Sequence, residues 1–287
     1  MVRSSPLLLA VVLLATPGAT RAGVRDGFSR ADYEAHVAAL RARVPGDFAI
    51  VIEPPFVVVG NGGNDAVRRA AEHTVRWAVE RLGRDFFDRG PKVLLTIWLL
   101  ADRASYERWA RQLTGEPPDT PYGFYSRRHR VLVMNIATGG GTLVHEIVHP
   151  LVEANLPGCP AWLNEGLGSL FEQASERDGH IVGLTNWRLE GLQDALRKQR
   201  VPPLRALVAT DDDAFYGRDS GRNYAQARYL LYWLQERGLL RRFWRGYVRT
   251  RAEDPSGWSA LVATVGKGAL PTLDRTFRAF VLGLAFE

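Results

Sequence analysis

The sequence predicts an α+β fold, in which a mixed α/β portion with a small sheet is followed by a helical portion. Up to residue 138, short β-branched and aromatic runs alternate with amphipathic stretches, whereas from residue 139 onward apolar residues recur at helical spacing. The 287 residues are 46% hydrophobic and 24% charged, which is the balance of an ordinary globular protein. We therefore expect one unit with two subdomains, residues 23–138 and 139–287, and a functional cleft between them.

In the first portion, the apolar pattern alternates between the period of helices and that of strands. Helices are predicted where apolar residues lie three or four positions apart, at residues 30–44, 64–82 and 105–113. Strands are predicted at runs bounded by Pro, Gly or Asn, at residues 48–52, 56–60, 93–100, 122–126 and 130–136. The run at 93–100 is almost entirely apolar, which indicates a strand covered on both faces. The last two strands flank Arg127-Arg128-His129, so we expect a hairpin there.

The second portion is predicted to be dominated by helices. The helical pattern covers residues 142–154, 160–173, 187–198, 224–237, 239–249, 256–265 and 271–282. Residues 211–222 are interpreted as a loop, and the Asp211-Asp212-Asp213 run in it lacks the spacing of a calcium-binding EF-hand. Pro150 cannot donate a backbone hydrogen bond, so we expect the first of these helices to kink or end soon after His149.

The first 22 residues have the layout of a secretory signal peptide. Arg3 precedes an apolar run at residues 7–15, and small residues follow as far as Ala22. The run is shorter than the roughly 20 residues that cross a bilayer. We expect cleavage after Ala22 rather than Ala19, export to a periplasmic or extracellular location, and no stable membrane insertion afterwards; an uncleaved anchor is the alternative.

Charge and cysteine content exclude some partners and some means of stabilisation. The formal net charge is +6, but the arginines are spread along the chain rather than concentrated with aromatic residues, so nucleic acid is not an expected partner. The single cysteine, Cys159, excludes an intramolecular disulfide. We interpret it as a thiol without a role, in preference to a metal ligand or a regulatory group.

The residues that point to chemistry begin at His145-Glu146-Ile147-Val148-His149. Histidines four residues apart in a helix lie one turn apart on one face, so both imidazoles can reach the same ion, with Glu146 beside them. Hydrolytic zinc sites take three protein ligands and leave one position open, so a third ligand is required. Glu153 is excluded, because eight residues place it about 12 Å from His145 along the helix.

Glu165 is the predicted third ligand. It lies on a separate helix, and the Pro157-Gly158 segment before that helix allows the chain to return antiparallel to the first. Glu172, two turns further along the same helix, is the alternative. The sequence therefore predicts one Zn²⁺ per chain, held by His145, His149 and Glu165.

These two segments resemble the paired motifs of the gluzincin zinc peptidases. The first motif followed by Ala161-Trp162-Leu163-Asn164-Glu165-Gly166-Leu167 is most similar to the bacterial peptidase-MA-like domains, which are related to thermolysin and the zinc aminopeptidases. The resemblance is specific over residues 142–173 and only architectural elsewhere. The Gly-x-Met-x-Asn exopeptidase motif of the aminopeptidases is absent, and Asn155 stands where the metzincins have their third histidine.

The resemblance implies a zincin-like fold and a zinc-dependent metallopeptidase that hydrolyses a peptide or protein substrate. Glu165 is then the third ligand, and Glu146 the general base that takes a proton from water. The family also uses a Tyr or His from the downstream helical region to stabilise the oxyanion, for which Tyr224 is the candidate and Tyr216 its competitor. In this family the strand corresponding to residues 130–136 is an edge strand that pairs with an extended substrate.

Two other functions are compatible with the sequence. A non-catalytic zinc-binding or interaction protein could keep this fold, although neither Glu146 nor a ligand is lost. A zinc hydrolase of a non-peptide amide or ester would use the same metal site. The remaining histidines are isolated and are not predicted ligands; they are His36, His73, His129 and His180.

Overall fold

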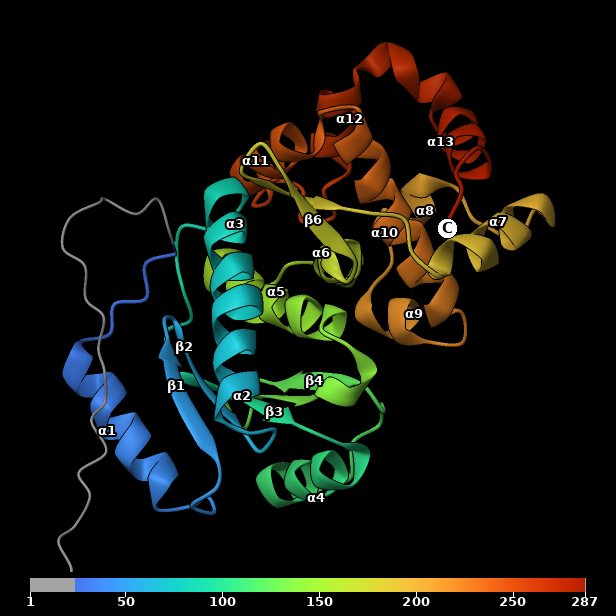
Figure 1. Cartoon of the computed structure of the whole chain (residues 1–287). Helices are drawn as coiled ribbons and strands as arrows, with labels where there is room; N and C mark the ends of the chain where they lie inside the picture. Colours follow the sequence, from blue (N-terminus) through green and yellow to red (C-terminus); the bar gives the residue numbers. More distant parts are fainter. Residues whose placement is uncertain (1–23, 287) are drawn as a thin grey trace, which may run out of the picture.

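The computed structural model describes residues 24–286, so the predicted signal peptide lies outside the described residues (Figure 1). Its centre is a five-stranded mixed sheet with parallel inner strands and an antiparallel strand at each edge. In spatial order the strands are β1 (Ala49–Glu53), β2 (Phe56–Gly60), β3 (Leu95–Leu100), β5 (Val131–Asn135) and β4 (Gly123–Ser126). A small sheet in this portion and the β4–β5 hairpin were both predicted.

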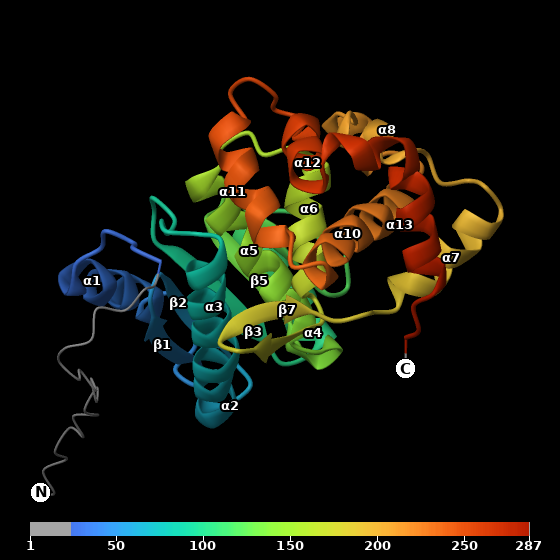
Figure 2. The ribbon, with the colours of Figure 1, turned by 90° about the horizontal axis from the view of Figure 1, so that it is seen from above.

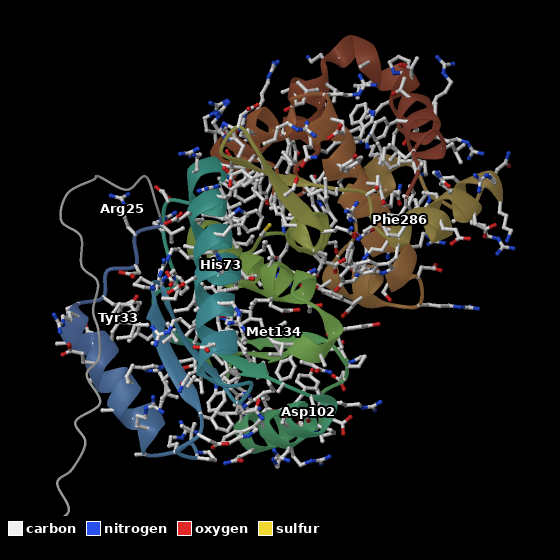
Figure 3. All side chains as sticks on the ribbon, viewed as in Figure 1. Arg25, Tyr33, His73, Asp102, Met134 and Phe286 are labelled. Atoms are coloured by element: carbon white, nitrogen blue, oxygen red, sulfur yellow. The ribbon has the colours of Figure 1, made fainter. Side chains whose placement is uncertain are left out.

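Helices cover both faces of this sheet. The three inner strands are therefore buried along their whole length. One face packs against α1 (Arg30–Arg41) and α4 (Arg103–Thr114). The other face packs against α5 (Gly141–Asn155) and a long helix made of α2 (Asn64–Ala70), a π-helical segment (Ala71–Arg76) and α3 (Trp77–Asp85). Figure 3 labels one residue from the hydrophobic cluster on each side of the sheet: Tyr33 of α1 and Met134 of β5.

The helical portion is built around α6 (Ala161–Phe171), which lies between α5 and α10 (Ser220–Glu236), as Figure 2 shows from above. Further helices surround this centre: α7 (Arg188–Arg197), α8 (Leu204–Val208), α9 (Asp212–Tyr216), α11 (Leu240–Thr250), α12 (Trp258–Val265) and α13 (Leu273–Leu282). Two 3₁₀ turns, Ile136–Thr138 and Lys267–Thr272, complete the chain. A single hydrophobic cluster extends from the sheet through α5 and α6 to α10, so the core crosses the predicted boundary at residue 138 without a break.

α5 agrees with the predicted helix at residues 142–154. It continues through Pro150 to Asn155 rather than ending after His149, since burial of Leu151 and Val152 outweighs the one backbone hydrogen bond that proline cannot make. Two other sequence predictions are wrong. β5 is not the edge strand, because it lies between β3 and β4, and β4 occupies the edge. The interval 211–222 is not a loop, because it contains α9 and the first turn of α10.

A two-stranded hairpin in the helical portion was not predicted. β6 (Ala174–Arg177) and β7 (His180–Gly183) pair antiparallel through Asp178-Gly179, both of which have positive φ. Asp-Gly flanked by short strands is a signal for this type of turn, so the sequence did contain the evidence. Among residues 24–286, no helix is both long enough and apolar enough to cross a membrane.

Candidate metal centre

Three potential ligands converge where α5 faces α6. Nε2 of His145 lies 3.2 Å from Oε2 of Glu165, and Nε2 of His149 lies 3.8 Å from the same oxygen. The ligand atoms of all three residues lie within 4.8 Å of one another, and the group is largely buried. Ligands of a tetrahedral zinc ion lie about 3.4 Å apart at normal bond lengths, so two imidazoles and a carboxylate with this spacing fit such an ion. Within residues 24–286 this is the one group of three or more His, Cys, Asp or Glu side chains so arranged.

Glycines allow the helices to approach this closely. A Cβ atom on Gly168 of α6 would lie 3.0 Å from Nε2 of His145. On Gly166 it would lie 3.1 Å from Leu231 of α10 and 3.3 Å from the carbonyl oxygen of Ala227. Gly166 and Gly168 therefore bring α6 close to α10 and to the His145 ring respectively.

The second nitrogen of each imidazole also faces an oxygen atom. Nδ1 of His149 forms a hydrogen bond with Oδ1 of Asn164 at 3.0 Å, whereas Nδ1 of His145 lies 3.0 Å from Oε1 of Glu172 without hydrogen-bond geometry. Partners of this kind fix the orientation of metal-binding histidines and leave Nε2 for the metal. Glu172, the alternative ligand, is therefore placed behind His145 and outside the ligand group, and the role of Asn164 was not foreseen.

Glu172 is in turn held by residues that the sequence analysis missed. Nη2 of Arg188 donates to its Oε1 at 2.9 Å, while Nε of Arg188 and Nδ2 of Asn186 donate to its Oε2, each at 3.3 Å. Arg188 lies on α7 and Asn186 just before it, far from the motif in sequence, so only the fold could reveal these contacts. The result is a chain of polar contacts from α7 to the candidate ligand His145.

Burial and opposite charges shift the ionisation of the site residues. Burial opposes the charged form of His145, but interactions with Glu165 and Glu172 outweigh it and raise its pKa to about 10. Burial likewise opposes the charged form of Glu165, but His149, His145 and Tyr216 outweigh it and lower its pKa to about 2. The cluster thus stabilises positive charge between the imidazoles and the carboxylates, the place where a metal ion would bind.

Glu146 is buried beside the ligands without being one of them. Its Oε2 lies 4.0 Å from Nε2 of His149. Burial, and to a smaller degree the charge of Glu165, raise the pKa of Glu146 above its usual value, against the effect of both histidines and of the Tyr125 backbone amide. A carboxylate whose proton affinity is raised in this way is suited to accept a proton during catalysis.

Both candidate tyrosines lie at the site, in different positions. The Tyr216 hydroxyl donates to Oε1 of Glu165 at 2.7 Å. Tyr224 lines the cavity in front of the ligands, and burial, with the nearby charge of Glu165, raises its pKa. The two rings lie 6.3 Å apart. Both tyrosines thus interact with the candidate ligand Glu165, and Tyr224 also lines the cavity.

The cavity is lined by β4 on one side and by α5 and α6 on the other. From β4 it receives Gly123, Phe124 and Tyr125, and from the helices His145, Glu146, His149, Val152, Glu153, Asn164 and Glu165. Cys159 also contributes to its wall, but it is not part of the ligand group, and burial raises the pKa of its thiol. Thiolate chemistry is therefore disfavoured at Cys159.

Asp211, His36 and His180, which the sequence analysis also considered, have partners outside the metal-binding group. Asp211 accepts a hydrogen bond from the amide of Ala214 and caps α9. His36 lies 2.8 Å from the Thr96 hydroxyl, and His180 lies 2.5 Å from Asp85. Neither histidine belongs to a metal-binding group among the described residues. The chain matches no protein-family model, and a search of curated proteins found no relative.

Proposed function

We propose that this protein is a zinc-dependent metallopeptidase of the gluzincin type, with His145, His149 and Glu165 as the metal ligands. The observation that carries the proposal is the convergence of these three side chains with the buried carboxylate of Glu146 next to them. The hydrogen bond between Nδ1 of His149 and Asn164, and the Glu172 carboxylate 3.0 Å from Nδ1 of His145, support it, because groups in these positions orient imidazoles for metal binding.

In the proposed reaction, each nearby residue has a separate task. Zinc, when bound, supplies Lewis-acid activation of a water molecule and of the scissile carbonyl. Glu146 accepts the proton of the attacking water and passes it to the leaving amine. Tyr224 donates a hydrogen bond to the developing oxyanion from the cavity wall. Tyr216 keeps the Glu165 carboxylate in its orientation.

The substrate is proposed to bind in the cavity as an extended chain. β4 is an edge strand, so its outer backbone groups have no partner strand, and Gly123 to Tyr125 line the cavity, where the Tyr125 amide contacts Glu146. A peptide backbone can pair with such an edge. The cavity would then serve as the active-site cleft of a zincin-like fold, and an exported location would match the leader at residues 1–22.

The test compares the wild-type chain with Glu146→Gln and with the matched control Glu190→Gln, whose side chain is exposed on α7. Elemental analysis is expected to give one zinc per chain in all three. Cleavage of an unstructured protein is expected to fall by about 10²-fold to 10⁴-fold in Glu146→Gln only, because the general base is lost.

Absence of zinc, or full activity in Glu146→Gln, would refute this function. Zinc without cleavage by the wild type would instead favour a binding role or a non-peptide amide or ester substrate.

A further inference from the structure

The cavity extends beyond the candidate ligands to the C-terminal end of α5. Glu146, His149 and Glu153 follow one another at spacings of three and four residues, so they share one face of the helix. All three line the cavity. Val152 from the last turn of α5 and Leu156 just after the helix line it as well. Glu153 is thus the acidic side chain that lies next along the cavity from the metal group.

Two side chains at the end of β4, Tyr125 and Arg127, contact Glu153. The Tyr125 hydroxyl donates to its Oε2 at 3.2 Å, and Nε of Arg127, just beyond the strand, lies 2.7 Å from its Oε1. The Glu153 side chain is 34% exposed, whereas that of Arg127 is 79% exposed. An ion pair with one mostly solvated partner contributes little, about 1 kcal/mol or less, so another cation can replace Arg127 at small cost.

The surroundings of Glu153 favour a cation. The last turn of α5 contains no basic residue, so the negative end of the helix dipole is not neutralised from within the helix. Val152 and Leu156 also line the cavity but are only 2% and 1% exposed, so the attraction for a cation comes from the carboxylate and the helix end. Lysine and arginine side chains are long enough to carry a charged end group to this carboxylate.

We infer that Glu153 forms a subsite for a lysine or arginine side chain of the peptide substrate, and that Arg127 occupies this place when no substrate is bound. The inference rests on the proposed function and adds a substrate preference to it. Glu153 lies about 10.5 Å beyond Glu146 along α5, and two residues of an extended chain span about 6.6 Å. A long side chain covers the difference, so the basic residue lies one or two positions from the bond that is cleaved.

The main test measures kcat/KM for peptides that carry Lys, Met or Glu at each of the two positions on either side of the cleaved bond. The wild type is expected to prefer Lys over Met by about tenfold or more at one position, and Glu153→Gln to abolish that preference. Arg127→Ala is expected to lower KM for the Lys peptide, because the competing cation is gone. Glu190→Gln serves as the matched control and keeps the preference.

The opposite assignment, in which Arg127 binds an acidic side chain, gives different results. It predicts a preference for the Glu peptide, and loss of that preference in Arg127→Ala. Either this pattern, or an unchanged Lys preference in Glu153→Gln, would overturn the inference.

A binding measurement separates failure of the subsite from failure of the proposed function. In the Glu146→Gln protein, calorimetry is expected to give a Kd for the Lys peptide about tenfold lower than for the Met peptide, and adding Glu153→Gln is expected to remove the difference. If no peptide is cleaved by the wild type but this difference is found, the peptidase proposal fails and the subsite stands. Equal binding of both peptides refutes the subsite, whatever the activity.

Discussion

At the scale of single residues, Gly168 determines how closely α6 approaches the imidazole of His145. A Cβ atom at this position would lie 3.0 Å from both Nε2 and Cδ2 of that ring, which is tighter than ordinary van der Waals contact. The ring has little room to move, because Nε2 is hydrogen-bonded to Glu165 and the Glu172 carboxylate lies 3.0 Å from Nδ1. The absence of a side chain at Gly168 is therefore part of the geometry of the site.

Gly168→Ala is expected to weaken zinc binding by about tenfold or more, because it displaces the His145 ring from its partners. The free energy of unfolding is not expected to fall equally, since alanine favours a helix by about 1 kcal/mol over glycine. Competition with a chelator measures the affinity, and urea denaturation measures the stability. Gly191→Ala on α7 is the matched control, because a Cβ atom there meets nothing within 4 Å. Unchanged zinc affinity in Gly168→Ala would contradict the prediction.

The two tyrosines are expected to differ in the property that their loss affects. Tyr224→Phe removes the proposed oxyanion donor and is expected to lower kcat by about 10²-fold or more at an unchanged zinc content. Tyr216→Phe removes the hydrogen bond to Oε1 of Glu165 and is expected to weaken zinc binding by about tenfold. Steady-state kinetics and zinc titration of both variants distinguish the roles, and the reverse pattern would exchange the assignments.

At the scale of elements, Asp85 at the end of α3 joins the β6–β7 hairpin to the helices. Its side chain is 2% exposed, and it accepts hydrogen bonds from the amide of Ile181 at 3.1 Å and from Nη1 of Arg241 at 3.2 Å. Nδ1 of His180 lies 2.5 Å from it. One buried carboxylate thus connects α3, β7 and α11.

Asp85→Ala is expected to lower the free energy of unfolding by about 2 to 4 kcal/mol, because it leaves the Ile181 amide and the Arg241 guanidinium without this acceptor. Urea denaturation followed by circular dichroism measures the change. Asp88→Ala is the comparison, since that side chain is 71% exposed, and its effect is expected to lie within about 0.5 kcal/mol. Equal losses in both variants would show that Asp85 has no special structural role.

How well the elements could be predicted depends on whether their signal is local. β3 and α6 are apolar over most of their length, and the two histidines of α5 are one turn apart, so the pattern alone predicted them. The apolar pattern predicted α5 as far as residue 154, whereas Pro150 by itself favoured an earlier end or a kink; burial against other elements decides that the helix continues. The order of β4 and β5 depends on pairing across the sheet. The contact between Glu172 and Arg188 could not be predicted either. The two residues are sixteen positions apart, one at the end of α6 and the other on α7, and no sequence motif links them.

At the scale of the whole molecule, the hydrophobic core is continuous across both portions and includes residues from both sides of the metal group. The candidate ligands come from two helices that already pack against each other, and one of them, α6, also packs against α10. We therefore expect folding not to depend on a bound metal, in contrast to small zinc domains whose core is too small to fold alone.

Removal of zinc by a chelator is accordingly expected to leave the far-ultraviolet circular dichroism unchanged at 25 °C. Tm is expected to fall by on the order of 10 °C, because a ligand present at about 1,000 times its Kd stabilises the folded state by about 4 kcal/mol. Thermal melts with and without chelator, followed by restoration with zinc, measure this. Loss of helical signal on chelation at 25 °C would contradict the prediction.

The position of β4 also has a consequence for self-association. An unpaired strand edge that faces solvent can recruit another copy of the same chain and start aggregation. Here the residues of the β4 edge line a cavity together with residues of α5 and α6, so we expect these helices to hinder the sheet of a second folded copy from aligning with it. A single extended chain is narrow enough to enter, and the same wall that would admit a substrate thereby protects the protein from polymerising along this edge.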